Sequence, residues 1–531
     1  MVHKSTTRRK RVALIGAGPT AVYLLRNLLL RSGRFDVTIY EAGVAAGCGV
    51  PYSEEHNSMD MMANITSIEL PPVLKSLADW LKGADKKLLA RFGIDRGEIS
   101  DRDFYPRILL GAYFIDQLAT LVKGGIAAGH SIAVETSTRV IEINPAGDKA
   151  WVKTTDSTRR SYDAVILATG HFDDLRDPSK SRKGIYRSPY PTHDLSLSKD
   201  RSALILGSSL SGVDAVVALA TKYGRFIEDG KATRYRPSDS KPIRITMSSR
   251  KGLVPEADFF YPIPEEPLLI FTAARLKSLL IGGKKNLLGR SVRLFRAQLQ
   301  ADDPEFVEKL GIKRFTPQRF HAAYFEMRRE SAGFKAVARD LARSRQNYLR
   351  RHTVMWRYTM MRAHEVFSEI APFFEPDDLE QFKRYMTPVF ADAYGCIPHR
   401  SVDKLLALHH AGCLEVVALE GGGEIRYGSG KFTLSGSGEN KVFGTIIDAR
   451  GQTASSLSQL GFGRLQELLD VEDFMRRTNG EPDDDQFRLP LRGVDKAEVF
   501  CLSIPVIMNR YPFAQGLFAC SEAAEIVARS L

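Results

Sequence analysis

The sequence predicts an α/β protein in which two Rossmann-like units, the second nested in the first, carry a basic helical insert. Two stretches, about 190 residues apart, each run from an apolar strand through a glycine-containing turn into an apolar helix. A third stretch, residues 271–370, repeats apolar side chains at helical spacing and is rich in Lys and Arg. These three features set the expected order of elements along the chain.

The first glycine turn lies between a strand-like run at residues 11–15 and a helix-like run at residues 22–30. Its first glycine permits a tight turn, its second lets the backbone approach a pyrophosphate, and its small final residue lets helix and strand pack closely. The pyrophosphate would lie on free N–H groups at the positive end of the helix. The predicted dinucleotide contacts are Gly16, Gly18, Pro19, Thr20 and Ala21.

An acidic residue follows the second strand-like run of this unit. Glu41 ends the run at residues 36–40 and lies 20 residues beyond Ala21. A carboxylate in that position can accept hydrogen bonds from a ribose diol, and it repels a 2′-phosphate. The first unit is therefore predicted to bind FAD or NAD and to reject NADP.

The second glycine turn follows the apolar run at residues 203–206. Ser209 stands where the middle glycine is expected, so its side chain would hold a phosphate slightly away from the backbone. The next strand ends in Ser248, Ser249, Arg250 and Lys251, whose hydroxyls and cations suit the 2′-phosphate of NADPH. The predicted NADPH contacts are Gly207, Ser209, Ser211, Gly212, Arg250 and Lys251. The alternatives are a relic fold without a ligand and a merely solvated basic turn.

Length and composition are typical of a large globular enzyme with two or three domains, since the 531 residues are 44% hydrophobic. No apolar run is long enough to span a membrane and no signal-like segment precedes the first strand, which predicts a cytoplasmic protein. The five cysteines form no C-x-x-C pair. This pattern excludes the disulfide-reductase class and any close-spaced zinc site.

The net charge of +12 arises from one segment. Residues 271–370 contain 21 Lys and Arg against 9 Asp and Glu, which accounts for the whole imbalance. Most of these cations are predicted to lie on the solvated faces of amphipathic helices. The members singled out are Arg328, Arg329, Arg350, Arg351 and Arg357. A funnel for an anionic substrate or a docking surface is the alternative, and nucleic-acid binding is not expected because no recognition module accompanies the charge.

The landmarks divide the chain into four segments. Residues 1–195 and 371–531 are predicted to form the first unit, residues 196–270 the second, and residues 271–370 the insert. The stretch at 515–528 is typical of a strand, a turn and a helix. The N-terminus of that helix can face a flavin ring in such folds, and Gly516 and Leu517 in the preceding stretch are predicted cofactor contacts.

Several stretches together resemble the FAD/NAD(P)-binding family of two-dinucleotide-domain flavoproteins. They are residues 16–21, 47–53, 61–65, 78–81, 105–107 and 249–255. The segment Ala168-Thr169-Gly170-His171 is similar to the ATG segment of N-hydroxylating flavin monooxygenases, whose usual next residue is tyrosine. The resemblance runs with gaps over most of the chain and is weakest in the insert. The departures are Ser209 and Arg450, the latter standing where an ATG-like threonine is expected.

The resemblance implies FAD at the first site, with Arg107, Thr169 and Gly170 among its contacts, and NADPH at the second. It also implies a C4a-hydroperoxyflavin as the oxidant; characterised relatives include enzymes that oxidise the amino nitrogen of aspartate. Asn64 lies in the loop that, by resemblance, borders the isoalloxazine, and its amide can both donate and accept. Asn64 is therefore the candidate catalytic residue for positioning flavin or substrate, with an exposed or helix-capping asparagine as the alternative.

Three functions remain open at this point. The favoured one is a flavin monooxygenase that uses molecular oxygen on a small-molecule substrate, an amine or another small polar nucleophile, with N-hydroxylation preferred. The second is an FAD-dependent NAD(P)H reductase or dehydrogenase without oxygenation. The third is a non-catalytic flavin-binding partner protein that docks through the basic helices. The sequence names neither the substrate nor the oligomeric state.

Overall fold

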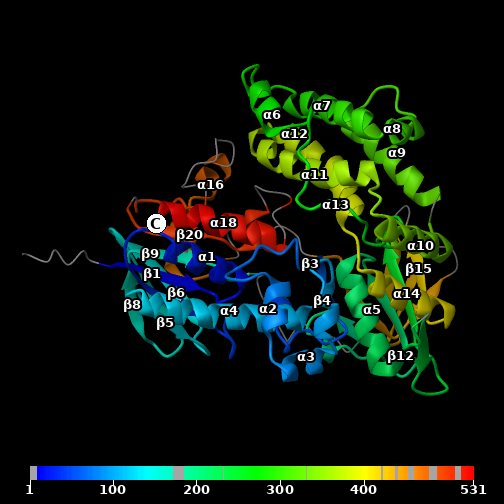
Figure 1. Cartoon of the computed structure of the whole chain (residues 1–531), viewed down its shortest axis with the longest axis horizontal. Helices are drawn as coiled ribbons and strands as arrows, with labels where there is room; N and C mark the ends of the chain where they lie inside the picture. Colours follow the sequence, from blue (N-terminus) through cyan, green and yellow to red (C-terminus); the bar gives the residue numbers. More distant parts are fainter. Residues whose placement is uncertain are drawn as a thin grey trace, which may run out of the picture. The chain divides into compact units, whose positions relative to one another are not determined.

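The chain folds into two compact units (Figure 1). The computed structural model describes residues 9–170, 184–230, 232–330, 332–419, 423–436, 440–451, 460–477, 487–494, 496–508, 513 and 516–531. The first unit comprises Met1–Glu55, Ile65–Asp173 and Thr453–Leu531, and the second comprises His56–Asn64 and Asp174–Gln452. The second unit is thus nested in the first, which confirms the predicted architecture. His171, from the ATG-like segment, lies outside the described residues.

A five-stranded parallel sheet forms the centre of the first unit. Its strand order is β20-β9-β1-β2-β5, the arrangement of a Rossmann fold. The strands are β1 (Lys10–Ile15), β2 (Phe35–Tyr40), β5 (Ser131–Glu135), β9 (Ala164–Leu167) and β20 (Glu498–Cys501). All four residues of β9 are buried, and Val165 and Leu167 pack on one face of the sheet against the antiparallel strands β6 (Val140–Ala146) and β7 (Lys149–Thr154).

The helices of the first unit include two that pack together from opposite ends of the sequence, α1 (Pro19–Leu29) and α18 (Gly516–Ser530) (Figure 1). The others are α2 (Leu77–Gly83), α3 (Lys86–Phe92), α4 (Arg107–Ala127), α15 (Arg464–Leu468), α16 (Val471–Arg477) and α17 (Ile504–Ile507). Further strands are β4 (Phe104–Pro106), β6 (Val140–Ala146), β7 (Lys149–Thr154) and β8 (Arg159–Tyr162), while β3 (Met62–Thr66) begins in the second unit and ends in the first. Residues 516–520, expected as strand and turn, already belong to α18.

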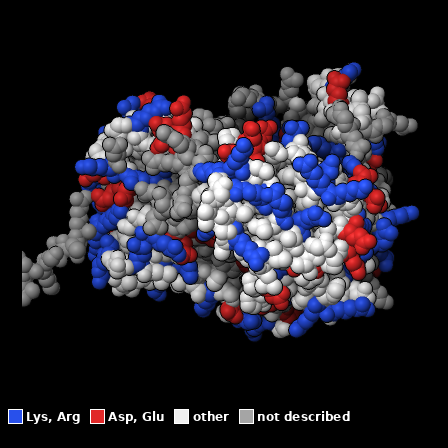
Figure 2. All heavy atoms as spheres, turned by 90° about the horizontal axis from the view of Figure 1, so that it is seen from above, with Lys and Arg blue, Asp and Glu red and all other residues white. Residues whose placement is uncertain are grey.

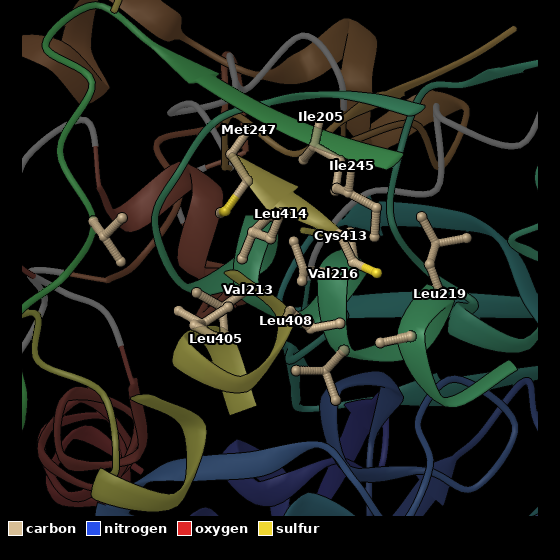
Figure 3. Packing of buried hydrophobic residues seen from close by; sticks show 14 of the residues in the cluster. Ile205, Val213, Val216, Leu219, Ile245, Met247, Leu405, Leu408, Cys413 and Leu414 are labelled. Carbon is tan, nitrogen blue, oxygen red and sulfur yellow. The ribbon is translucent and has the colours of Figure 1, made fainter. Parts of the chain in front are cut away.

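The second unit repeats the parallel arrangement with the strand order β10-β19-β11-β14-β15. The strands are β10 (Ile185–Tyr186), β11 (Ser202–Leu206), β14 (Arg244–Ser249), β15 (Leu414–Ala418) and β19 (Thr445–Asp448). Figure 3 shows the core, where Ile205 and Met247 of the sheet meet Val216 of α5 (Leu210–Tyr223) and Leu405 of α14 (His399–His410). Antiparallel strands complete the unit: β12 (Gly224–Glu228), β13 (Thr233–Pro237), β16 (Glu424–Gly428), β17 (Lys431–Ser435) and β18 (Lys441–Phe443).

The segment boundaries differ from the expected ones in residues 371–451. The sequence assigns this stretch to the first unit, whereas β15 and β19 both pair within the second sheet. A buried parallel strand is only a short apolar run, so its sequence carries no mark of the sheet that it joins.

The basic insert is helical, as predicted, and extends beyond residue 370. This helical region consists of α6 (Ala273–Leu280), α7 (Leu287–Asp302), α8 (Pro304–Leu310), α9 (Pro317–Glu330), α10 (Phe334–Arg350), α11 (Met355–Ile370), α12 (Pro376–Gln381) and α13 (Thr387–Tyr394). Its core is aromatic: the ring of Phe295 lies 5.5–5.7 Å from the rings of Phe271, Phe320, Phe367 and Phe390. Edge-to-face and tilted ring pairs of this kind stabilise a core beyond the burial of their area.

Two of the arginines expected on a solvated face are buried instead. Arg328 is 5% exposed and Arg357 is 4% exposed, whereas Arg329, Arg350 and Arg351 are exposed as predicted. Arg328 lies 3.0 Å from a Glu256 carboxylate oxygen and 2.6 Å from an Asp392 oxygen. Helical periodicity cannot reveal these partners, since they lie 72 and 64 residues away in sequence.

We expect Arg328→Met to destabilise the second unit by about 3–5 kcal/mol, because it removes the buried cation that pairs with Asp392 and that shares Glu256 with Arg357. The matched change Arg329→Met, one residue further on an exposed face, should cost no more than about 0.5 kcal/mol. Urea unfolding of the two variants measures the difference. Equal midpoints for both variants would show that the Arg328 ion pairs do not stabilise the fold.

Candidate cofactor sites

In the turn after β1, the backbone at Gly16 packs closely against the backbone at Ala168, after β9. Gly16 has φ +99°, and a Cβ built on it would lie only 2.4 Å from the Ala168 carbonyl oxygen. A Cβ on Gly18 would lie 3.3 Å from the Cα of Gly49, itself at φ +61°. Only glycine fits the first of these positions without displacing a strand. The turn therefore has the close backbone packing that the predicted pyrophosphate cradle requires.

Helix α1 begins at this turn without a side-chain cap. Gly18 is its N-cap and Pro19 its first residue, and no side chain caps its first turn among the described residues. Ala21 is buried, which permits close packing of helix and strand. Thr20 hydrogen-bonds the Cys520 thiol of α18; burial raises the pKa of that thiol, and the hydrogen bond opposes the shift. The uncapped amide end of α1 can accept an anion.

Glu41 is fixed at the end of β2 by backbone amides. Its carboxylate oxygens accept the N–H of Ala17 at 3.1 Å and of Gly43 at 2.7 Å. Each oxygen of a carboxylate has two acceptor sites, so one on each remains for a ribose hydroxyl. The position and chemistry of Glu41 agree with the predicted role.

An unsatisfied polar atom follows β9. The Thr169 hydroxyl is buried and has no hydrogen-bond partner in the described part of the chain. Next to it, Gly170 has φ +66° and its carbonyl accepts the Ser503 hydroxyl at 2.6 Å. A buried hydroxyl without a partner costs about 1–3 kcal/mol, so such an atom calls for a ligand. The protein's own atoms therefore fit FAD at this position.

Arg107 opens α4 beside Tyr52. Burial raises the pKa of the Tyr52 hydroxyl, and the positive charge of Arg107 opposes that shift. The segment that carries Tyr52 lies directly on α4, since a Cβ on Gly111 would lie 2.2 Å from the Tyr52 carbonyl oxygen. A Cβ on Gly47 would likewise lie 2.7 Å from the Cα of Ile115. Sequence reasoning did not identify Gly47, Gly49 and Gly111 as close contacts, although the spaced glycines at 47 and 49 were a signal.

The remaining residues predicted for the first site lie at the start of α18 and within β3. Gly516 begins α18 with φ +80°, and Leu517 is buried. Asn64 lies in β3 rather than in a loop, and its side chain is exposed. The role of Asn64 in positioning flavin or substrate stays a prediction.

The turn after β11 repeats the geometry of the first turn. Gly207 has φ +109°, and its Cβ would lie 2.4 Å from the Ala449 carbonyl oxygen. A Cβ on Gly212 would lie 2.5 Å from the Gly207 carbonyl oxygen, so helix and strand pack closely here too. Ser209 is the exposed N-cap of α5 without a side-chain cap bond, and Ser211 is half-buried in the first turn.

The two turns also identify Arg450 as the counterpart of Thr169. The Cβ on Gly16 would lie 3.3 Å from the Thr169 Cα, and that on Gly207 would lie 3.1 Å from the Arg450 Cα. Arg450 donates to both oxygens of Asp448, at 2.9 and 2.6 Å. The second site therefore presents an anchored guanidinium where the first presents a hydroxyl.

Arg250 and Lys251 follow β14 but have different surroundings. Arg250 is exposed, whereas the Lys251 ammonium lies 3.0 Å from the ring centroid of Phe325 in α9. Burial, and next the charge of Arg250, lowers the pKa of Lys251 to about 8. Burial, Lys251 and Arg250 lower the pKa of His321, also in α9, to about 4. The helical region thus supplies neighbours of this strand end that sequence reasoning missed, because about 70 residues separate them.

The described residues contain no group of three or more His, Cys, Asp or Glu placed to hold a metal ion. None of the helices in the described ranges is long and apolar enough to cross a membrane. All five cysteines are free and buried.

Known proteins match the chain over both units. Residues 13–172 match the FAD-NAD(P)-binding family, and residues 272–394 match the YdhS-like middle domain. The chain is 33% identical over 527 residues to the uncharacterised protein YdhS of Escherichia coli (strain K12), covering 98% of this chain and 97% of that protein.

Two solved structures that resemble this chain over nearly its whole length have low sequence identity to it. An ornithine N-hydroxylase from Kutzneria sp. 744 has a TM-score of 0.46 at 12% identity, covering 98% of this chain and 99% of that one. A bacillithiol disulfide reductase from Bacillus cereus has a TM-score of 0.41 at 11% identity, covering 98% of each chain.

We expect Gly16→Ala to yield protein without bound flavin, since the new Cβ would collide with the Ala168 carbonyl oxygen. Gly33→Ala is the matched control: Gly33 also has a positive φ, but nothing lies within 4 Å of its Cβ position. Gly207→Ala should keep flavin and lose NADPH binding. The ratio of flavin to protein absorbance measures flavin content, titration with NADPH measures coenzyme binding, and circular dichroism tests folding. Full flavin content in Gly16→Ala would contradict the assignment of the first site.

Proposed function

The chain belongs to the YdhS family, and because its residues 13–172 match the FAD-NAD(P)-binding family, we propose that it is an FAD-dependent oxidoreductase that uses NADPH. The favoured activity is a monooxygenase reaction, with an amine or another small polar molecule as substrate and N-hydroxylation as the preferred outcome. Molecular oxygen is the co-substrate.

One observation supports two dinucleotides rather than one. In both parallel sheets, a Cβ placed on the first glycine of the turn would lie 2.4 Å from a carbonyl oxygen of the adjacent strand end. The strand that follows each turn ends differently: Glu41 in the first unit, Arg250 and Lys251 in the second. A carboxylate favours a free ribose diol, and cations favour a 2′-phosphate. This contrast supports FAD in the first unit and NADPH in the second.

The residues of the first unit have separate tasks in this proposal. The uncapped start of α1 binds the pyrophosphate, Glu41 binds the ribose, and Thr169 donates its unsatisfied hydroxyl to the cofactor. Arg107 and the start of α18 contact other parts of the FAD. A bound FAD would accept hydride from NADPH and pass electrons to oxygen. Asn64 would position the flavin or the substrate with its exposed amide.

The cysteines argue against thiol–disulfide chemistry as the activity. Burial raises the pKa of Cys396 and of Cys501 to about 12 and that of Cys48 to about 11. Because the thiolate is the nucleophile in disulfide exchange, thiols of this kind are inert near neutral pH. Electrons are therefore expected to pass from the flavin to oxygen or to another acceptor rather than to a protein disulfide.

The activity is tested by anaerobic mixing of the flavin-loaded protein with NADPH, followed by a pulse of oxygen and a panel of amines. We expect NADPH to bleach the flavin. In the presence of one amine, the oxygen consumed should yield hydroxylated amine in place of hydrogen peroxide. Bleaching with peroxide alone for every amine would favour the reductase. Absence of bleaching would contradict both enzymatic functions.

We expect Arg250→Ala to raise the KM for NADPH about tenfold or more and to leave the KM for NADH unchanged, because a charge-assisted hydrogen bond contributes about 1.5–3 kcal/mol. Arg244→Ala is the matched control, since Arg244 is an exposed arginine at the opposite end of the same strand. Steady-state flavin reduction with both coenzymes measures the effect. An equal change for NADPH and NADH would refute the selection of the 2′-phosphate.

A further inference from the structure

The cations of the helical region fall into two groups with different surroundings. Arg328, Arg357 and Arg362 are buried and paired with carboxylates, so they belong to the core. A second group is exposed and forms no ion pair with any carboxylate in the part of the chain that the structure describes. Its members are Arg293, Arg296, Lys313 and Arg314. The positive charge of this second group is therefore not neutralised by a carboxylate of the described residues.

These four cations line one groove. The groove has a volume of about 720 Å³ and is bordered by α7, by the segment at 313–316 and by the first turn of α9, with α12 at one end. Small-molecule sites typically have volumes of about 300–1,000 Å³. The groove is therefore of the size that holds a small ligand.

The electrostatics of the groove favour an anion strongly. Asp378 is the one carboxylate among the described residues that line it, and that side chain accepts the N–H of Leu288 at 3.0 Å. Three guanidinium groups and one ammonium group thus face a single acid that is already engaged. Figure 2, which looks onto the helical region, shows many blue Lys and Arg side chains across this face of the molecule.

Two helices begin at the groove and add to its positive potential. Asn286 precedes α7, Pro317 opens α9, and both line the groove. The N-terminal end of a helix carries a partial positive charge that favours anions. Phe315 borders the groove beneath Arg296, whose guanidinium lies 6.0 Å from the ring centroid, so an apolar surface adjoins the charged groups.

We propose that this groove binds a small polyphosphorylated anion with at least two phosphate groups. The planar fork of a guanidinium matches the oxygens of phosphate with two parallel hydrogen bonds, and three such forks gather here. Adjacent phosphates place several negative charges within the span of the four cations. The site is separate from the residues assigned to FAD and NADPH, and the proposal does not depend on the redox activity.

The test is isothermal titration of the full-length, flavin-loaded protein with inorganic tripolyphosphate at low and moderate salt. We expect saturable binding that weakens with salt and that is weakened about a hundredfold in the double variant Arg293→Gln/Arg296→Gln, since each lost charge-assisted bond is worth about tenfold or more. The control double variant Arg275→Gln/Arg339→Gln removes two exposed arginines of the same region outside the groove, and it should bind as the unmodified protein does.

Three outcomes would overturn the proposal. Equal weakening in both double variants would mean non-specific screening of a basic surface. Equally tight binding of citrate would mean that the groove does not select phosphate. Loss of tripolyphosphate binding in Arg250→Ala, with retention in Arg293→Gln/Arg296→Gln, would place the anion at the coenzyme site instead.

Two further measurements keep the result interpretable. Lys313→Glu reverses one exposed charge on the other border of the groove and should weaken tripolyphosphate independently of the arginines. Flavin content and the rate of flavin reduction by NADPH should be unchanged in Arg293→Gln/Arg296→Gln. A groove that fails to bind tripolyphosphate while flavin reduction proceeds would refute this inference alone, and the reverse result would refute only the proposed function.

Discussion

The order of strands in a parallel sheet is the constraint on which both candidate sites depend. Placing β9 beside β1, on the side opposite to β2, brings the Ala168 carbonyl against the turn at Gly16. Because all strands run in one direction, the glycine turn, the acid that ends β2 and the hydroxyl after β9 meet at the same edge of the sheet. The second unit reaches the same result with β19 and β11. The strand order alone thus determines which residues meet at each candidate site.

The helical region is joined to the second sheet by charge as well as by apolar packing. Glu256, shortly after β14, meets Arg328 of α9 at 3.0 Å and Arg357 of α11 at 3.7 Å. Burial raises the pKa of Glu256, and the two guanidinium groups oppose this. Desolvating such a network costs free energy, and a network of this kind favours one arrangement of its partners over others. The segment that follows β14 is therefore tied to α9 and α11, which come much later in the chain.

Local sequence patterns predicted the two turns and the helical character of the insert, because each depends on residues close together in the chain. The nested arrangement was inferred from the return to strand-like runs after the insert. Gly16 and Gly207 each allow a tight turn between a strand and a helix, and the spacing of the glycines predicts such a turn. The membership of β15 and β19 in the second sheet could not be predicted, since an apolar run fits either sheet. The burial of Arg328 and Arg357 was missed for a related reason: a cation on a helix has the same pattern whether water or a distant carboxylate faces it.

The pairing of β9 with β20 has a consequence for the order of folding during synthesis. Val165 pairs with Val499, so the first sheet lacks an edge strand until more than 330 further residues have left the ribosome. The strands of the second sheet, from β10 to β19, all emerge within that interval. The inner unit can therefore complete its sheet while the outer one still exposes an open strand edge, a situation in which chaperones protect nascent chains from pairing with one another. A ribosome that stalls between residues 452 and 498 would therefore carry a second unit whose sheet strands are all synthesised and a first unit that still lacks β20.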